Sequence, residues 1–342
     1  MRGRDVLIVA AVLLVGGFAL ADALRGNESD DGRRTATAAL VPPPEPGVTA
    51  RTETVQGLPT GRFGGRIVFT DEGCNVREID LASGTLFPFP RIPSTCTLVS
   101  APRTERIAIG LRSSRRDVGP YRVLDLNRPS ADLVAFRAQN SSVVWSGDGR
   151  FVAWCEPSGR GRDLDLDLGR EIRTLPGCAV AYSGARPLYV RGRGLFLGPK
   201  RLVEAPHRIL AASVGTDGTL AIADADGLFH VATRPDRPFD LDETRPIPPE
   251  LRGLPILFSP TNCNAAVVST GPSANPTVSV LNIRPCGEAR PPSTFPGHAA
   301  SWAPDGLNLA VAEREQVTIH PMRGDDPVIR IPVVATDLGW KA

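Results

Sequence analysis

The sequence predicts an all-β protein whose main domain is a β-propeller, and three observations support this prediction. The chain of 342 residues contains 34 glycines and 33 prolines, a composition that suits many short strands joined by turns. After Gly61, apolar stretches of four to seven residues alternate with Gly, Pro, Asp and Ser. A unit of two such strands then recurs along the chain at the spacing of propeller blades.

The first 24 residues have the pattern of an export signal. Arg2 and Arg4 precede an uncharged apolar run from Val6 to Ala21, and Asp22 is the first acid after it. Residues 6–24 either remain as a membrane anchor or are removed at an Ala-x-Ala site, 19–21 or 21–23. Both alternatives leave the amino terminus in the cytoplasm. We therefore expect the rest of the chain on the outer side of the cytoplasmic membrane, or secreted if the signal is cleaved.

Residues 25–60 have few large apolar side chains and no hydrophobic period. The segment begins RGNESDDGRRTATA and continues with VPPPEPG. We predict a flexible or semi-extended tether over 25–60, followed by a propeller domain over 61–342.

The recurring unit is clearest in SVVWSGDGRFVAWC, residues 142–155. Its Gly-Asp-Gly segment supplies a tight turn between two apolar strands. Similar units occur at residues 97–110, 179–190, 209–224, 255–269 and 300–313, at intervals of about 31 to 46 residues, and most are followed by a third strand such as VREID or YRVLD. Asp148, Asp217 and Asp305 are expected to be turn residues.

The two ends of the propeller domain each resemble half of a unit. Residues 64–73 look like a second strand without a first, and residues 332–340 look like a first strand without a second. Together they predict one more blade, so that strands from both termini close the ring and remove its open edges. The count is then seven blades, with six as the alternative.

The segments WSGDGRFVAW and WAPDGLNLAVA resemble the W-S-P-D-G repeat of TolB-like, WD40-like propellers. Gly147 stands where that repeat prefers Pro, and Ala303 where it prefers Ser. The resemblance implies a propeller fold from about residue 61 onward and a protein that works by binding partners. It implies function only weakly, because propellers include binding modules and enzymes.

Six cysteines fall into three local pairs. Their separations are 22, 23 and 23 residues for the pairs Cys74 and Cys96, Cys155 and Cys178, and Cys263 and Cys286. An exported chain meets an oxidising compartment, so we expect these pairs to form disulfides, although six cysteines allow 15 connectivities in principle. No close C-x-x-C spacing suggests a metal site instead.

The sequence predicts no catalytic residue, metal ligand or cofactor site. It contains no G-x-S-x-G elbow, and none of its histidines, His207, His230, His298 and His320, belongs to a metal-binding pair. In DLDLDL, strand alternation places Asp163, Asp165 and Asp167 on one face. We expect that face to be solvated with Leu164, Leu166 and Leu168 buried, and calcium binding by the three carboxylates is the alternative.

The net charge of +2 makes nucleic acid an unlikely partner. Two arginine clusters nevertheless lie near loops, Arg112, Arg115 and Arg116, and Arg186, Arg191 and Arg193. We expect ordinary, solvent-screened surface charge there, and a locally basic propeller face that binds an anionic wall polymer or lipid headgroups is the alternative.

The leading interpretation is a non-enzymatic binding platform in the cell envelope, held to the membrane by residues 6–24, with an envelope protein or an anionic polymer as partner. The alternative is an extracytoplasmic hydrolase or lyase that acts on sugars or lactones in the central channel.

Overall fold

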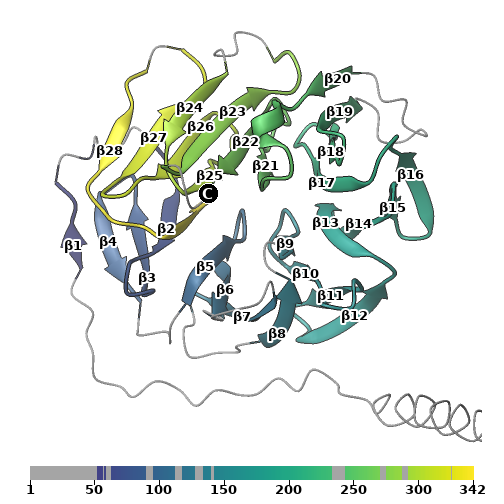
Figure 1. Ribbon diagram of the computed structural model, residues 1–342. Coiled ribbons are helices and arrows are strands. Elements are labelled where there is room, and N and C mark those ends of the chain that lie inside the picture. Colours follow the sequence, from purple (N-terminus) through teal and green to yellow (C-terminus); the bar gives the residue numbers. More distant parts are fainter. Residues whose placement is uncertain are drawn as a thin grey trace, which may run out of the picture. The chain divides into compact units, whose positions relative to one another are not determined.

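The computed structural model describes residues 52–56, 58, 63–89, 95–111, 118–127, 134–139, 142–232, 243–269, 275–286, 292–324 and 326–342. Seven antiparallel sheets follow one another around a ring (Figure 1). Within these ranges the only helix is the single 3-10 turn η1, Pro249–Leu251. The chain is an all-β propeller of seven blades, and the alternative of six blades is wrong.

Each blade contains four strands that lie side by side, in order from the inside of the ring to the outside. We name the blades A to G in chain order. Blade A consists, from inside to outside, of β29 (Asp337–Lys341), β2 (Arg66–Thr70), β3 (Val76–Asp80) and β4 (Thr85–Pro88), with β1 (Glu53–Thr54) added at its outer edge. Blade B contains β5 (Thr95–Ser100), β6 (Arg106–Leu111), β7 (Val118–Asp125) and β8 (Val134–Gln139). Blade C contains β9 (Val144–Trp145), β10 (Phe151–Cys155), β11 (Gly161–Asp165) and β12 (Arg170–Leu175).

The remaining blades repeat this order. Blade D contains β13 (Cys178–Ser183), β14 (Arg186–Arg191), β15 (Gly194–Leu197) and β16 (Lys200–Glu204). Blade E contains β17 (Ile209–Val214), β18 (Leu220–Asp224), β19 (Leu228–Ala232) and β20 (Glu243–Pro246). Blade F contains β21 (Ile256–Phe258), β22 (Asn264–Ser269), β23 (Thr277–Asn282) and β24 (Ser293–Pro296), and blade G contains β25 (Ala299–Trp302), β26 (Asn308–Ala312), β27 (Val317–Pro321) and β28 (Ile329–Ile331).

The up-and-down strand order gives the ring two distinct faces. Turns between first and second strands, and between third and fourth strands, lie on one side, which we call the hairpin face. Turns between second and third strands, and the connections from one blade to the next, lie on the other side, which we call the crossover face.

The hydrophobic core lies between neighbouring blades. Because a blade is covered on both sides by its neighbours, its second strand is buried on both faces and is apolar almost throughout. All five residues of β10, FVAWC, and all five of β18, LAIAD, are buried.

Two tryptophans occupy equivalent places in blades C and G. The indole Nε1 of Trp145 donates a hydrogen bond of 3.0 Å to the carbonyl oxygen of Val99 in blade B. In the same way, Nε1 of Trp302 donates to the carbonyl oxygen of Leu257 in blade F at 2.9 Å. Each tryptophan therefore ties its own blade to the first strand of the blade before it.

The turns that follow these tryptophans require glycine. Gly149 has a φ of 67° and Gly306 a φ of 72°, values that favour glycine. A Cβ atom at either position would also press against a threonine of the preceding blade, Thr104 or Thr261. The W-x-x-D-G pattern is therefore a device for packing and turning the chain.

Strands from both ends of the described chain meet in blade A. The five residues of β29 pair with the five of β2, from Arg66 opposite Lys341 to Thr70 opposite Asp337. The ammonium group of Lys341 is almost fully buried and contacts Glu78 at 3.0 Å and Glu105 of blade B at 2.5 Å. Arg66 bonds to the same two carboxylates, so four charges meet at this seam between blades A and B.

The segment expected as a tether, 25–60, enters the described structure only near its end. Glu53 and Thr54 form β1 against β4, and Leu58 is buried in the core cluster of blades A and G. The predicted export signal at residues 1–24 lies outside the described residues. Within the described part of the chain, no helix is long and apolar enough to cross a membrane.

Removal of residues 333–342 should abolish cooperative folding. The deletion takes away all of β29, and with it the buried Leu338, Trp340 and Lys341, and leaves Glu78 without its ammonium partner. Thermal unfolding followed by circular dichroism tests this, with deletion of the exposed Ala342 alone as the control. A truncated chain that melts at the unchanged temperature would contradict the closure of the ring by these strands.

Asp337, the first residue of β29, links the same seam to the inner strand of blade B. Its Oδ2 accepts a hydrogen bond of 2.7 Å from the amide of Leu98, and its Oδ1 accepts one of 2.9 Å from the amide of Leu338. Burial raises the pKa of Asp337 to about 6, although these two amides favour the charged form.

Replacement of Asp337 by Asn should change the pH dependence of stability. The unfolded chain releases this proton near its ordinary pKa of 3.8, while the folded chain keeps it up to about pH 6. The contribution of Asp337 to the free energy of unfolding therefore falls as pH rises through this window. Since Asn can still accept the Leu98 hydrogen bond, the variant should gain stability relative to the parent between these two pH values. Urea unfolding at several pH values measures the difference, and parallel pH profiles would contradict the prediction.

Candidate functional site

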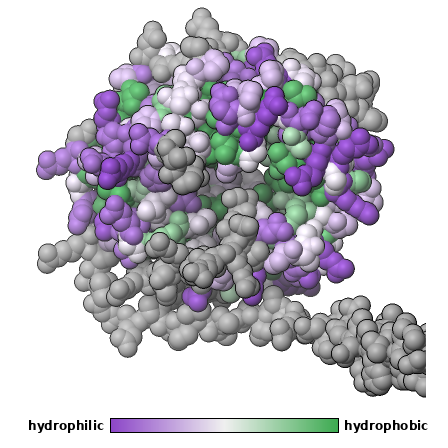
Figure 2. All heavy atoms as spheres, viewed as in Figure 1, coloured by the Kyte–Doolittle hydropathy of each residue, from purple (hydrophilic) through white to green (hydrophobic). Residues whose placement is uncertain are grey.

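The ring encloses a cavity of about 1140 Å³ that is lined mainly by the innermost strands. Its wall includes residues at both faces of the ring, such as Gly147 and Pro304 on the hairpin face and Gln139 and Arg208 on the crossover face. In the space-filling view, hydrophobic residues gather around the central hollow, while hydrophilic ones dominate the outer rim (Figure 2). This cavity is the candidate functional site.

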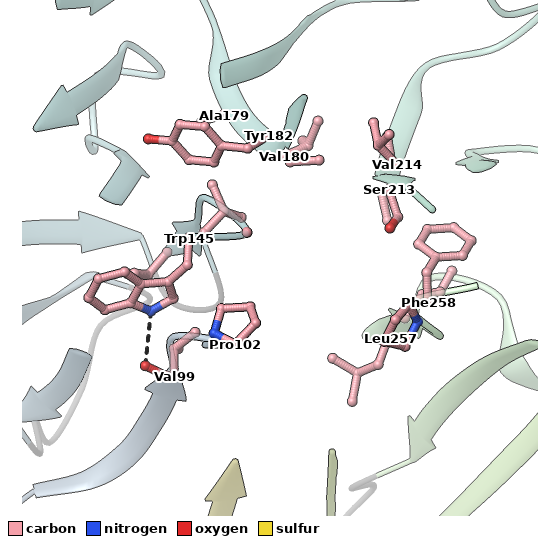
Figure 3. A pocket seen from close by; sticks show the side chains of 18 of the residues that line it. Val99, Pro102, Trp145, Ala179, Val180, Tyr182, Ser213, Val214, Leu257 and Phe258 are labelled. Atoms are coloured by element: carbon pink, nitrogen blue, oxygen red, sulfur yellow. Dashed lines mark hydrogen bonds between the residues drawn. The ribbon is translucent and has the colours of Figure 1, made fainter. Parts of the chain in front are cut away.

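The cavity wall is mostly apolar. In Figure 3, Val99, Pro102 and Trp145 lie on one side of the opening, and Leu257, Phe258 and Val214 lie on the other. The charged side chains among the described lining residues are Arg103, Asp148 and Arg208. Such a wall suits an apolar group of a ligand better than a highly charged one.

Each innermost strand also has one edge without a neighbouring strand, although Leu98, Val99 and Leu257 already bond through a main-chain group to an adjacent blade. Each of β5, β9, β13, β17, β21 and β25 pairs with only one neighbour, the second strand of its own blade. Backbone donors and acceptors on such an edge can bind an added polypeptide strand. The cavity therefore combines apolar side chains with polar main-chain groups.

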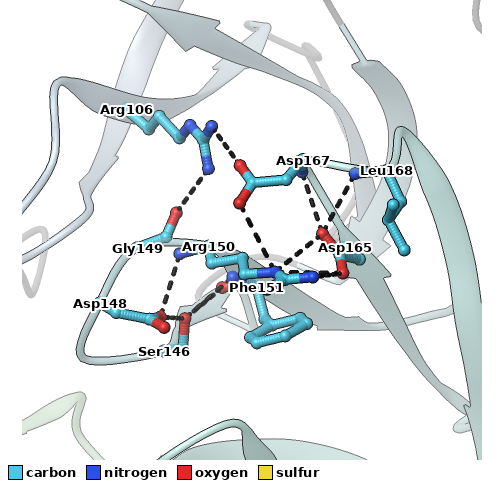
Figure 4. A network of polar contacts seen from close by, with 9 residues as sticks. All are labelled: Arg106, Ser146, Asp148, Gly149, Arg150, Phe151, Asp165, Asp167 and Leu168. Carbon is cyan, nitrogen blue, oxygen red and sulfur yellow. Dashed lines mark hydrogen bonds and ion pairs between the residues drawn. The ribbon is translucent and has the colours of Figure 1, made fainter.

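The carboxylate of Asp148 is held within its turn. It accepts a hydrogen bond of 2.5 Å from the Ser146 hydroxyl and one of 3.1 Å from the amide of Arg150 (Figure 4). Although burial opposes it, these hydrogen bonds lower the pKa of Asp148, so the group is ionised at neutral pH. An ionised carboxylate with a lowered pKa is a poor general acid.

The prediction of a solvated face for the DLDLDL segment is wrong. Asp163 and Asp165 are buried, whereas Leu168 is 53% exposed. Strand β11 ends at Asp165, so the alternation of faces stops there and the residues after it belong to a turn. The DLDLDL pattern continues three residues beyond the strand. Within the strand both faces are covered, since Leu164 is buried as well as Asp163 and Asp165.

Arginines bind the carboxylates of this segment (Figure 4). The Arg150 guanidinium donates to Asp165 at 2.6 Å, and Arg106 of blade B donates to Asp167 at 2.7 Å. The hydrogen bonds from Arg150 lower the pKa of Asp165. These oxygen atoms serve ion pairs, one within blade C and one between blades B and C, which argues against the calcium alternative. The described residues contain no group of three or more His, Cys, Asp or Glu side chains placed to hold a metal ion.

A second polar contact lies behind the cavity wall. Tyr182, whose ring lines the cavity, donates a hydrogen bond of 2.7 Å to the buried Asp163, and Arg173 contacts the other oxygen of that carboxylate at 2.6 Å. Burial raises the pKa of Asp163, against the opposing effects of Tyr182 and Arg173, and burial also raises the pKa of Tyr182. The contact holds the Tyr182 ring in the wall between blades C and D.

The structure contains three disulfides, which join Cys74 to Cys96, Cys155 to Cys178, and Cys263 to Cys286. These are the three local pairs of the sequence. The first connects blades A and B and the second connects blades C and D, both on the crossover face. The third lies within blade F on the hairpin face. Cys155 and Cys178 also line the cavity.

The histidines have ordinary polar or packing contacts. His230 is buried with Asp224, at 2.8 Å, and His320 is buried against the ring of Phe295. His298 lies 2.8 Å from the carbonyl oxygen of Ala335, and the exposed His207 lies 3.2 Å from Asp226. None of the four lines the cavity.

The alternative of a basic face does not hold for the set of Arg186, Arg191 and Arg193. Strand β14 runs from Arg186 to Arg191, so Arg186 lies on the hairpin face while Arg191 and Arg193 lie on the crossover face. Residues at opposite ends of one strand, such as Arg186 and Arg191, lie on opposite faces of the ring. Arg112, Arg115 and Arg116 lie outside the described residues. Asp217 and Asp305 lie in turns, as expected, and each accepts a backbone hydrogen bond, from Thr219 and Leu307 respectively.

No family model matches the sequence, and no curated protein matches it. Among solved structures, the chain is similar to a "putative 6-phosphogluconolactonase" from Bacteroides uniformis, with 12% identity, a TM-score of 0.54, and coverage of 81% of this chain and 99% of that one. TolB from Acinetobacter baumannii gives 14% identity, a TM-score of 0.49, and coverage of 84% and 69%. The Cps50 (Swd1) propeller domain of Myceliophteria thermophila gives 13% identity and a TM-score of 0.49, with coverage of 71% of this chain and 86% of that one. At these identities the comparisons show the fold alone, and that fold is a β-propeller.

Loss of the Cys155 to Cys178 bridge should destabilise the domain by about 3 kcal/mol, because the unfolded chain regains the freedom of a loop of this size. The double replacement by Ala tests this in urea unfolding. A double replacement of Cys263 and Cys286 is the matched control, since both bridges span 23 residues. Chain entropy predicts equal losses. A far larger loss for the first pair would show that blades C and D separate without their bridge, and no loss would contradict the prediction.

Proposed function

We propose that this protein is a non-enzymatic binding platform of the cell envelope, which receives an apolar part of a partner protein at its central cavity. The observation that supports this most is the cavity wall, which joins apolar side chains to the free edges of the inner strands. The ring holds this wall in place through contacts between blades, so little order has to be gained on binding.

The envelope location is part of the proposal and rests on two features. Three disulfides are typical of a protein that folds outside the cytoplasm. Residues 6–24 supply an apolar segment preceded by Arg2 and Arg4, as an export signal or anchor requires. Ring closure by strands from both termini also belongs to the proposal, and the pairing of β29 with β2 supports it.

The alternative is an enzyme that acts on lactones or sugars in the cavity, since the same fold occurs in a "putative 6-phosphogluconolactonase". General acid and base catalysis on this wall would have to use Asp148, which is the carboxyl group among the described lining residues. Hydrogen bonds to Ser146 and Arg150 already occupy it. The arrangement therefore favours binding over hydrolysis.

A photo-reactive amino acid at Leu210 should capture a partner protein in native membranes, whereas the same residue at Leu168 should not. Leu210 lines the cavity and is 39% exposed, and Leu168 is 53% exposed on the β11 to β12 turn away from the cavity. The two leucines thus compare the cavity with an equally accessible site on the same full-length chain. Mass spectrometry of the crosslinked bands identifies the partner.

Equal capture at both positions, or none at Leu210, would contradict the platform. Turnover of a lactone by the purified chain, lost in an Asp148→Asn variant, would establish the enzyme instead. Fractionation of cells with thiol labelling, before and after reduction, checks the envelope location separately.

A further inference from the structure

We propose that the crossover face over blades C, D and E binds a linear phosphate-bearing polyanion through Arg160, Arg191 and Arg208. This surface is distinct from the apolar wall of the cavity, although it borders the cavity at Arg208. The proposal rests on the placement of these three side chains and on the ion pairs around them.

The three arginines belong to three consecutive blades. Arg160 ends the turn between β10 and β11, Arg191 is the last residue of β14, and Arg208 immediately precedes β17. All three are exposed. Each position is on the crossover face, because it lies between second and third strands or between two blades.

Backbone contacts show that the three positions follow one another across this face. The carbonyl oxygen of Gly159 lies 3.7 Å from the Cys178 sulfur, and Cys178 is the register partner of Val190. The carbonyl oxygen of Gly192 accepts a hydrogen bond of 3.4 Å from the amide of Ile209. Residues adjacent to Arg160, Arg191 and Arg208 are therefore in contact from blade to blade, and the arginines form an arc.

Two of the acidic side chains near this arc, Glu156 and Glu204, are paired with other arginines. Glu156 bonds to Arg162 at 2.8 Å, Glu204 bonds to Arg193 at 2.8 Å, and Asp226 faces His207 at 3.2 Å. None of the three arc arginines has a carboxylate partner within the described part of the chain. Asp226 follows Ala225, whose amide bonds to the carbonyl oxygen of Arg208, and it offsets part of the positive charge while His207 is neutral. With three arginines and one such carboxylate, the arc keeps a net positive charge.

Charge on the opposite side of the same face has the other sign. The turn between β2 and β3 exposes Glu72, while its Asp71 is paired with Arg77. The turn between β26 and β27 holds Glu313 and Glu315 with one arginine, Arg314. A flat surface of anionic lipids laid on this face would meet both regions and be repelled by the second. A linear polymer can follow the arc alone, which favours a polymer over a membrane.

Arginine also favours phosphate as the ligand group. Its planar guanidinium donates two parallel hydrogen bonds to a phosphate or carboxylate, and it remains charged at any physiological pH. Three exposed guanidinium groups can each bind one phosphate of a linear polyanion, and this kind of binding needs no pocket. Binding of this kind weakens steeply as salt concentration rises, because each contact releases counterions.

The test compares two triple variants of the full-length chain. The arc variant replaces Arg160, Arg191 and Arg208 by Gln. The control variant replaces Arg170, Arg186 and Arg323 by Gln, which are exposed residues of the hairpin face that lose the same total charge. Fluorescence anisotropy of labelled inorganic polyphosphate gives the dissociation constant at several salt concentrations, and equal melting temperatures show that both variants fold.

The arc variant should bind polyphosphate about tenfold or more weakly than the parent, with a salt dependence reduced by about two to three counterions. The control variant should stay within about twofold of the parent. Equal weakening in both variants would overturn the proposal, because only net charge would then matter. Tighter binding of poly-glutamate would assign the arc to an acidic protein segment instead. Recruitment to phosphatidylglycerol vesicles that depends on the three arc arginines, without polyphosphate binding, would assign it to a membrane.

Discussion

Burial of each blade between two neighbours is the constraint on which the rest of the structure depends. A four-stranded sheet with two apolar faces has no stable existence in water, and only a closed set of blades covers every face. The buried second strands β10 and β18 show the result directly. The cavity follows from the same constraint, because seven twisted sheets packed around an axis cannot bring their inner strands together at the centre.

Contacts between blades are also where the polar groups of the protein are concentrated. The indoles of Trp145 and Trp302 bond to the preceding blades, and Arg106 bonds across to Asp167. At the seam, Lys341 and Arg66 share Glu78 and Glu105. Buried charges of this kind are costly to desolvate, and they give specificity of position more than net stability. They position adjacent blades relative to one another, and the placement of the blades sets the shape of the cavity wall.

The sequence allowed the repeat to be recognised because its period is local. A Trp, a Gly-Asp-Gly turn and a short apolar strand lie within one unit, so the positions of Trp145, Asp148 and Gly149 could be interpreted without knowledge of the rest of the chain. The cysteine pairs followed from the same map of blades. The interpretation of DLDLDL was wrong for two reasons. Both faces of β11 are covered, so Asp163 and Asp165 are buried along with Leu164, and the strand ends at Asp165, before Leu168. Its partners Arg150 and Tyr182 come from a turn and from another blade.

By itself, the sequence predicted seven repeating units with six as the alternative, the turns between their strands and the local pairs of cysteines, because each depends on residues close together in the chain. Tertiary structure alone decided which side chains line the cavity and which charges remain unpaired. Arg186 and Arg191 are neighbours in sequence but lie on opposite faces, whereas Arg160, Arg191 and Arg208 come from three blades and form one arc. Such groupings depend on how blades are placed around the ring, and no single repeat contains that information.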